Sequence, residues 1–156
     1  MTDTEASGRI DRIAVSGTAA AAFITDVEGR VLLVKPASRD HWGFAGGWVD
    51  RGESPHEGCA REIEEEIGLR LEVGALLVVD WLTDVGYIAE PLTYYVFDAG
   101  VVDDPAAVRP RPGEIEQVGF FAPEQALERI GEFNRARLAL AIEARLTGTT
   151  VYQPYR

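Results

Sequence analysis

Three glutamates close together, Glu62, Glu65 and Glu66, are the residues in this sequence whose types and spacing most clearly indicate chemistry. On a helix, at about 100° per residue, they fall within roughly a 100° arc, while Ile63 and Ile67 lie on the opposing side. Carboxylates at these spacings repel one another by about a few tenths of a kcal/mol per pair, so a compensating cation is expected. Mg²⁺ suits such a group because it prefers oxygen ligands and is usually held by carboxylates together with substrate phosphates.

The residues around this acidic run decide between a metal site and a solvated helix face. Most acidic runs on helices are simply solvated. Here Arg61 can offset part of the charge by pairing with Glu65 or with Glu53. Gly46 and Gly47, which precede the run, allow the backbone to pass close to an ion. Together these residues favour the metal site.

The acidic run is predicted to lie on a helix with a defined start and end. Ser54 and Glu57 form a capping box pattern, with Pro55 at the first helical position. These residues satisfy the donors that are left free at a helix start, so the helix is predicted to begin at Ser54. Gly68 can adopt the left-handed conformation that ends a helix.

The stretch from Gly47 to Leu69 matches a known motif without a missing position. It reads G-x5-E-x7-R-E-I-x-E-E-x-G-L, and it resembles the Nudix box of the Nudix hydrolase family. The resemblance implies an α/β fold, with a mixed β-sheet in an α/β/α sandwich and the box as a loop-helix-loop. One local departure is Ala45, where the family usually has proline.

The family resemblance also implies a reaction, in which water attacks a diphosphate joined to another moiety. The implied substrate is a nucleoside diphosphate derivative: a nucleoside triphosphate, ADP-ribose or a sugar nucleotide, or a dinucleoside polyphosphate. The implied cofactor is Mg²⁺, with Mn²⁺ as the alternative. The second hypothesis is a catalytically silent Nudix-fold module that binds a nucleotide as a sensor.

Roles for individual residues follow from the match to the family motif. Glu62, Glu65 and Glu66 would be metal ligands, and the Gly46 backbone carbonyl would join them. Glu62 is also a candidate for the general base. Glu53 would orient the loop and Arg61.

A further base candidate lies outside the box. Several family members use a glutamate in a loop before the strand that precedes the last helices, and Glu114 occupies that position. Glu116, two residues further along the chain, is considered beside it. A solvated loop carboxylate is the alternative interpretation of Glu114.

Substrate-binding candidates are aromatic side chains that could stack on a base and arginines that could bind a phosphate or ribose. They are Phe44, Trp48 and Tyr87, with Phe23 and Trp81 also considered, and the loop residues Arg109 and Arg111. The alternative is that the aromatic residues belong to the core and that the arginines only add solubility.

Composition limits the organisation and the partners of the chain. Its 156 residues suit one domain, predicted over 18–148, with an N-terminal extension over 1–17 and a tail over 149–156. A net charge of -11 argues against nucleic acid and anionic membranes as partners, and favours a small nucleotide-type substrate. A homodimer is left open. The single cysteine, Cys59, fits a reducing cytoplasm, and no apolar run approaches the about 18 residues of a membrane span.

The remaining elements follow from periodicity and turn signals. Strands are predicted over 18–25, 31–35, 71–82 with a bend at Gly74, 92–99 and 117–121. Helices are predicted over 123–130 and 134–146, and Asn134 is expected to cap the second one. A long loop is predicted over 101–113. One short strand is expected in the N-terminal extension from Ile10, Ile13 and Val15, and no structure is predicted for the tail.

Overall fold

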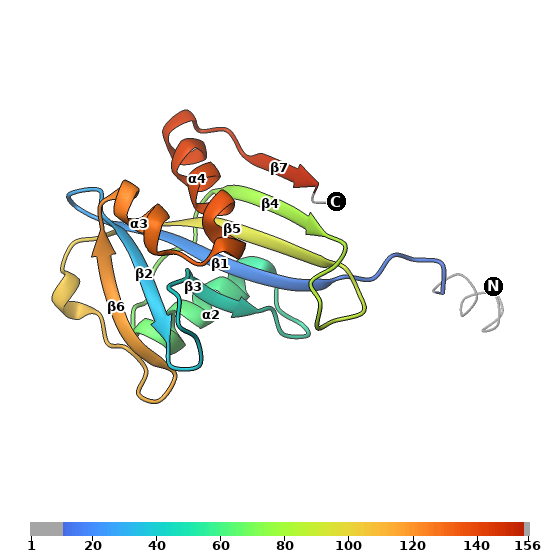
Figure 1. Ribbon diagram of the computed structural model, residues 1–156, viewed down its shortest axis with the longest axis horizontal. Coiled ribbons are helices and arrows are strands. Elements are labelled where there is room, and N and C mark those ends of the chain that lie inside the picture. The colour runs from blue at the N-terminus through green and yellow to red at the C-terminus, as the bar shows by residue number, and fades with distance from the viewer. Residues whose placement is uncertain (1–10, 155–156) are drawn as a thin grey trace.

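A mixed seven-stranded sheet with helices on both faces organises residues 11–154, the part of the chain that the computed structural model describes (Figure 1). The strands are β1 (Gly17–Asp26), β2 (Val31–Pro36), β3 (Ala45–Trp48), β4 (Leu76–Leu82), β5 (Leu92–Val102), β6 (Ile115–Phe121) and β7 (Val151–Pro154). The helices are α2 (Pro55–Ile67), α3 (Pro123–Arg129) and α4 (Glu132–Thr147), with a 3₁₀ turn, η1, over Pro105–Ala107.

The central strand is β1, which contacts three other strands. The order across the sheet is β6-β2-β1-β5-β4-β7, and β3 also pairs with β1. β1 runs parallel to β5 and antiparallel to both β2 and β3. The pairing of Ala20 with Gly47 and of Ala21 with Gly46 places the two glycines beside the middle of the sheet.

Each face of the sheet packs against its own helix layer. On one face, Ala22 and Ile24 of β1 pack in one cluster with Ile63 of α2. On the other face, Phe23 packs in a second cluster with Leu138 of α4. A strand that is buried on both faces needs a continuous apolar run, which explains the alanine-rich sequence of β1. The predicted α/β/α sandwich is confirmed.

Several predicted boundaries were wrong, and β5, for example, continues to Val102, into the predicted loop over 101–113. The strand predicted from Leu71 begins at Leu76, because Leu71 and Val73 pack against the α2-side core as part of a connecting loop. The last helix begins at Glu132 with Gly131 as its N-cap, not at Asn134. The Asn134 Oδ1 atom instead accepts a hydrogen bond from Arg137, so this side chain does not cap the helix.

The chain ends also differ from the predictions. Residues 11–16 form no strand, and Ile10 lies outside the described residues. The tail, for which no structure was predicted, contributes β7, which pairs in parallel with β4. The Thr150 hydroxyl donates a hydrogen bond of 2.7 Å to the Leu76 carbonyl just before this pairing. Within 11–154, no helix combines the length and the apolar character required to cross a membrane.

Candidate active site

Helix α2 is fixed at both ends by its own sequence. The Ser54 hydroxyl accepts a hydrogen bond from the Glu57 amide at 3.2 Å, and the Ser54 amide donates one to the Glu57 carboxylate at 2.6 Å. Gly68 closes the helix with φ +70°, and its amide donates to the Glu64 carbonyl. Local residues therefore set the position of the acidic face along the chain, as predicted.

Two of the helix carboxylates lie directly against the Gly46–Gly47 backbone of β3. The Gly46 amide donates a hydrogen bond of 3.0 Å to Glu66 Oε2. A Cβ atom at Gly47 would lie only 2.6 Å from Glu62 Oε1, and one at Gly46 only 2.7 Å from the Ala21 Cα atom. The absence of a side chain at these positions lets the Glu62 carboxylate approach Gly47 and the β1 backbone approach Gly46 this closely.

Arg61 holds the acidic side chains together. Its guanidinium donates two hydrogen bonds to Glu53, at 2.7 and 3.1 Å. It donates further bonds to Glu62 at 3.0 Å, to Glu65 at 3.2 Å, and to the Trp48 carbonyl at 2.9 Å. The predicted pairing of Arg61 with Glu53 and Glu65 is confirmed, and one cation thus orders three carboxylates.

Burial leaves two carboxylates without enough compensating charge. Burial raises the pKa of Glu66 to about 7, against the lowering effect of the Gly46 amide. Burial also raises the pKa of Glu62, although Arg61 opposes this change. The pKa of Glu53 is lowered, first by its hydrogen bonds from Arg61. Glu62 and Glu66 are therefore the carboxylates that an added cation would stabilise most.

The fit of this group to a divalent ion can be judged from its donors. Across residues 11–154, no three acidic, histidine or cysteine side chains already converge as a metal cluster. Glu62 and Glu65 instead turn towards Arg61, and Glu66 turns towards the Gly46 amide. The available donors are carboxylate and backbone oxygens, which suit a hard ion such as Mg²⁺. The residues fit the ion, provided that the side chains exchange these hydrogen bonds for it.

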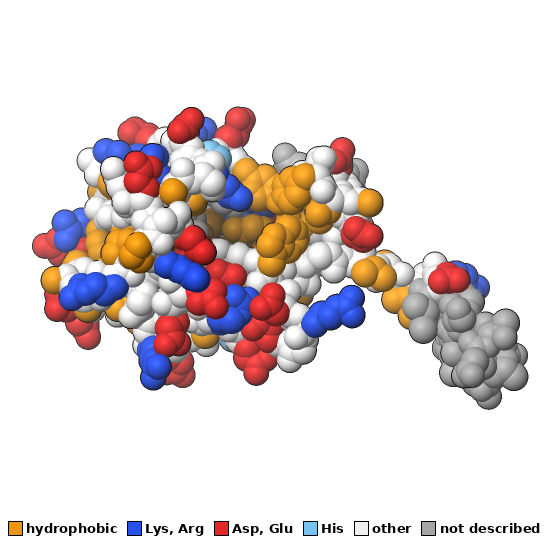
Figure 2. Space-filling model, turned by 90° about the horizontal axis from the view of Figure 1, so that it is seen from below, with side chains coloured by type: hydrophobic (Ala, Val, Ile, Leu, Met, Phe, Trp, Pro, Cys, Tyr) orange, Lys and Arg blue, Asp and Glu red, His pale blue; other side chains and the backbone are white. Residues whose placement is uncertain are grey.

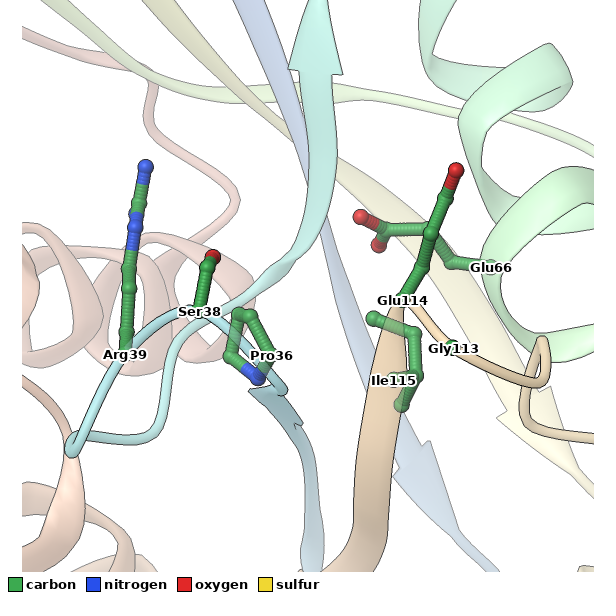
Figure 3. Close-up of a pocket in the computed structure, with 7 residues that line it drawn as sticks. All are labelled: Pro36, Ser38, Arg39, Glu66, Gly113, Glu114 and Ile115. Carbon is green, nitrogen blue, oxygen red and sulfur yellow. The ribbon is translucent and has the colours of Figure 1, made fainter.

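A cleft of about 370 Å³, here called the acidic cleft, opens beside Glu66. It is lined by Pro36, Ser38, Arg39, Glu66, Gly113, Glu114 and Ile115. Figure 3 shows Glu66 and Glu114 on one side of the cleft and Arg39 and Ser38 on the other. The structure thus brings Glu114, from the loop before β6, next to a carboxylate of α2. Burial is the largest cause of the raised Glu66 pKa, and the charges of Glu62 and Glu114 raise it by smaller amounts.

A second cleft of about 170 Å³, here called the aromatic cleft, lies on the other side of Arg39. It is lined by Ala19, Arg39, Gly47, Trp48, Tyr87, Leu92, Tyr94, Phe133 and Asn134. The Trp48 and Tyr87 rings meet edge to face at 6.4 Å, and they are 44% and 70% exposed. Seen from the side on which α2 lies in Figure 1, hydrophobic side chains surround a hollow, with acidic and basic side chains near its border (Figure 2).

Comparison with known proteins decides the family. The family described as NUDIX domain matches residues 15–141. The chain belongs to the Nudix family. A MutT-like protein of Streptomyces ambofaciens is 30% identical over 123 residues, which cover 79% of this chain and 75% of that protein. This chain is accordingly an enzyme of that family, a Nudix hydrolase of the pyrophosphohydrolase type.

One further relative of this Nudix hydrolase is similar in sequence, and another is similar in structure. The CTP pyrophosphohydrolase of Escherichia coli K12 is 40% identical over 57 residues, 34% of this chain and 42% of that protein. The solved structure of a UDP-X diphosphatase superposes with a TM-score of 0.73, covering 98% of this chain and 76% of that one, at 23% identity. The second likeness shows the shared fold alone.

Three predicted stacking residues do not face the clefts. Phe44 is 7% exposed and packs in the α4-side core, because it precedes β3 on the face turned away from α2. Phe23 is also buried in that core, with the Arg145 guanidinium 4.2 Å from its ring. Trp81 lies opposite Pro154 in the pairing of β4 with β7, at the far side of the sheet order.

The two predicted arginines are engaged elsewhere. The Arg109 guanidinium donates hydrogen bonds to the carbonyls of Ala106 and Val108 in its own loop, so it stabilises that loop. Arg111 lies 3.6 Å from the Glu114 carboxylate. It therefore stands near the acidic cleft as a partner of Glu114, and it does not line the cleft itself.

The sequence interpretation missed the residues that complete the aromatic cleft of this Nudix hydrolase. Tyr94, Phe133 and Asn134 come from β5 and α4, and no local pattern connects them. Arg39 had a detectable signal, since it is a lone cation on the turn that leads towards the two glycines.

Proposed function

We propose that this Nudix hydrolase uses Mg²⁺ or Mn²⁺ to hydrolyse the diphosphate bond of a nucleoside diphosphate derivative. The substrate would be a nucleoside triphosphate, ADP-ribose or a sugar nucleotide, or a dinucleoside polyphosphate. The observation that carries the proposal is the placement of the Glu62 and Glu66 carboxylates against the Gly46–Gly47 backbone, without full charge compensation. The relative named as a CTP pyrophosphohydrolase favours a nucleotide substrate.

In this proposal the box residues divide into ligands and positioning residues. Glu62, Glu65 and Glu66 would hold the ion, together with the Gly46 carbonyl. When bound, the ion would neutralise phosphate oxygens and make water a stronger acid. Glu53 and Arg61 would act through the ligands, because Arg61 bonds to Glu62 and Glu65 and is itself fixed by Glu53.

Glu114 is the general base that the geometry supports best outside the box. Its carboxylate is more than half exposed and lines the acidic cleft beside Glu66, where a proton from an attacking water could be accepted. Glu116, two residues further along the chain, pairs instead with Lys35 at 2.6 Å. Glu62 stays the alternative base, since it lies against Gly47 at the other end of the acidic face.

The proposal is tested by measuring the products released from a panel of nucleotides in the presence of Mg²⁺. Glu66→Gln is expected to lower kcat/KM by about 10²- to 10⁴-fold, because it removes a ligand and a charge from the site. Glu64→Gln is the matched control, because Glu64 lies on the same helix but pairs with the exposed Arg70. That variant should stay within about twofold of the wild type.

The same panel separates the roles of the two glutamates near β6. Glu114→Gln should lower kcat with little change in KM, whereas Glu116→Gln should change neither. Equal activities for Glu66→Gln and Glu64→Gln, or full turnover in a chelator, would contradict the proposed site. Tight nucleotide binding without any turnover would support the silent sensor instead.

A further inference from the structure

Arg39 is the cation left available between the acidic cleft and the aromatic cleft. In the described part of the chain, four other cations near the site have carboxylate partners. Arg61 contacts Glu53, Glu62 and Glu65, Lys35 contacts Glu116, Arg111 contacts Glu114, and Arg137 contacts Asp80. Arg39 has no such ion pair within residues 11–154, so its charge is free to meet a ligand.

The position of Arg39 is set by a tight turn after β2. Its amide donates a hydrogen bond of 3.2 Å to the Pro36 carbonyl, and the residue is exposed. Its side chain lines both clefts and, in the acidic cleft, stands across from Glu66 and Glu114 (Figure 3). It also lies close enough to Tyr94 to oppose, after Arg137, the burial that raises the Tyr94 pKa to about 12. The guanidinium therefore connects the two clefts.

We propose that Arg39 binds a phosphate of the substrate. This phosphate would lie between the substrate's ring, which is held in the aromatic cleft, and the bond that is cleaved beside Glu66. This inference rests on the proposed function and adds the order of the substrate groups along the surface. The ring would lie between Trp48 and Phe133, the bridging phosphate at Arg39, and the outer phosphate at the acidic cleft.

The chemistry of the aromatic cleft, Arg39 and the acidic cleft supports this order. Aromatic side chains provide faces and edges for a planar ring, and both Trp48 and Tyr87 are accessible. A guanidinium is a planar, permanently charged group that binds phosphate through two parallel hydrogen bonds. The chain has a net charge of -11, so a phosphate approaching the acidic cleft gains most from a local cation. Nucleoside phosphates fit this arrangement, and diphosphates without an aromatic ring do not.

Binding measurements without metal and without turnover test the assignment. Each of the four common nucleoside monophosphates and the matching nucleosides would be titrated by calorimetry in a chelator, against wild type, Arg39→Gln and Arg39→Lys. Arg39→Gln is expected to weaken the monophosphate that binds best by about 10- to 100-fold, since a charge-assisted contact is lost. It should leave the affinity for the matching nucleoside within about twofold. Arg39→Lys should give an intermediate loss, because the charge stays while the paired hydrogen bonds do not.

Arg70→Gln is the matched control, because Arg70 is a highly exposed arginine that pairs with Glu64. It should bind monophosphates as the wild type does. The inference is overturned if Arg39→Gln weakens the monophosphate no more than Arg70→Gln, or if it weakens the nucleoside equally. It is also overturned if the wild type binds no monophosphate more tightly than inorganic phosphate.

These outcomes are distinct from a failure of the proposed function. The expected binding pattern with no hydrolysis of any nucleotide would sustain the role of Arg39 and contradict the enzyme reaction. Hydrolysis of a nucleotide together with unchanged monophosphate binding in Arg39→Gln would support the enzyme reaction and contradict the role of Arg39.

Discussion

Arg61 is the residue on which the order of the acidic face depends most. It contacts Glu53 through two hydrogen bonds and reaches Glu62 and Glu65 through a third nitrogen. Neither Glu62 nor Glu65 has another protein partner among the side-chain hydrogen bonds of residues 11–154. The loss of this guanidinium would leave both carboxylates free to rotate and to repel each other.

We expect Arg61→Met to lower kcat/KM by about 10- to 100-fold, the usual effect of removing a residue that orients metal ligands. Arg61→Lys should recover only part of the loss, because an ammonium group cannot bind Glu53 in the same bidentate manner. Steady-state kinetics together with a Mg²⁺ titration measure the effect. Full activity in Arg61→Met would show that the ligands orient themselves.

The raised pKa of Glu66 predicts that Mg²⁺ binding depends on pH near neutrality. Burial raises this pKa from its ordinary value of 4.5 to about 7, so a proton competes with the ion at pH values below about 7. The affinity for Mg²⁺ should therefore fall by about tenfold for each pH unit below 7. Calorimetric titrations at a series of pH values measure this slope, and Glu66→Gln should show a weaker affinity with a shallower slope.

The stability of the metal-free protein gives an independent check on the same group. Between pH 4.5 and about 7 the folded state holds the Glu66 proton more tightly than the unfolded chain does. The contribution of Glu66 to the free energy of unfolding is thus largest below pH 4.5, and it is lost as the pH rises through 7. Thermal unfolding in a chelator should show this decrease in the wild type and not in Glu66→Gln. An identical pH dependence in both proteins would contradict the raised pKa.

At the scale of elements, β3 and α2 form the site together. The capped ends of α2 fix which residues form its acidic face, and the two glycines of β3 let that face approach the sheet. The two glycines meet different neighbours. The three atoms nearest to a Cβ at Gly46 belong to the backbone of Ala20 and Ala21, whereas the three nearest to one at Gly47 belong to the Glu62 carboxylate.

These neighbours predict different results for two similar substitutions. Gly46→Ala should destabilise the protein by about 1–3 kcal/mol, because the backbone of β1 cannot move aside and φ at this position is +154°. Gly47→Ala should lower the stability less than Gly46→Ala does, because the flexible Glu62 side chain can move aside. It should lower the activity more, because Glu62 then leaves its position. Chemical denaturation and kinetics on both variants test the contrast. The reverse pattern would mean that Glu62 is not needed beside Gly47.

At the scale of the molecule, a buried ion pair connects the α4 layer to the sheet beneath the aromatic cleft. Arg137 of α4 and Asp80 of β4 are both almost fully buried and lie 2.5 Å apart. The Arg137 guanidinium also stacks 4.4 Å from the Tyr94 ring and 4.3 Å from the Phe133 ring, two walls of that cleft. Layer packing and cleft shape therefore depend on the same side chain.

We expect Arg137→Leu to lower the free energy of unfolding by about 3–5 kcal/mol, because it leaves the Asp80 carboxylate buried without a partner. The double variant Asp80→Leu/Arg137→Leu should recover most of this loss, since no buried charge remains. Urea denaturation of the two single variants and the double variant gives the coupling energy. Additive losses would show that the pair does not interact in the way described.

Much of the site could be predicted from local sequence. The caps of α2, the shared face of the glutamates and the pairing of Arg61 with Glu65 depend on residues within one or two helical turns. The interaction of Arg61 with Glu53 spans eight residues and was anticipated from the box spacing. The position of Glu114 beside Glu66 followed from the family resemblance and not from any local pattern.

The sequence was less informative where distant strands decide the outcome. β3 and β7 are four residues each, too short for a periodic signal, and each forms by pairing with backbone that β1 or β4 leaves available. Phe44 had the composition of a stacking residue, but the face on which it lies depends on how β3 pairs with β1. Its ring consequently packs in the core.

The sequence by itself determined the carboxylates and their helix, because those features depend on neighbours along the chain, and its resemblance to the Nudix family implied the class of reaction. Only the tertiary structure decided which side chains line the aromatic cleft together. Arg39, Trp48, Tyr94 and Phe133 come from four separate segments that the sheet and the α4 layer bring together. Contacts between such segments depend on strand order and packing, which no spacing within one segment encodes.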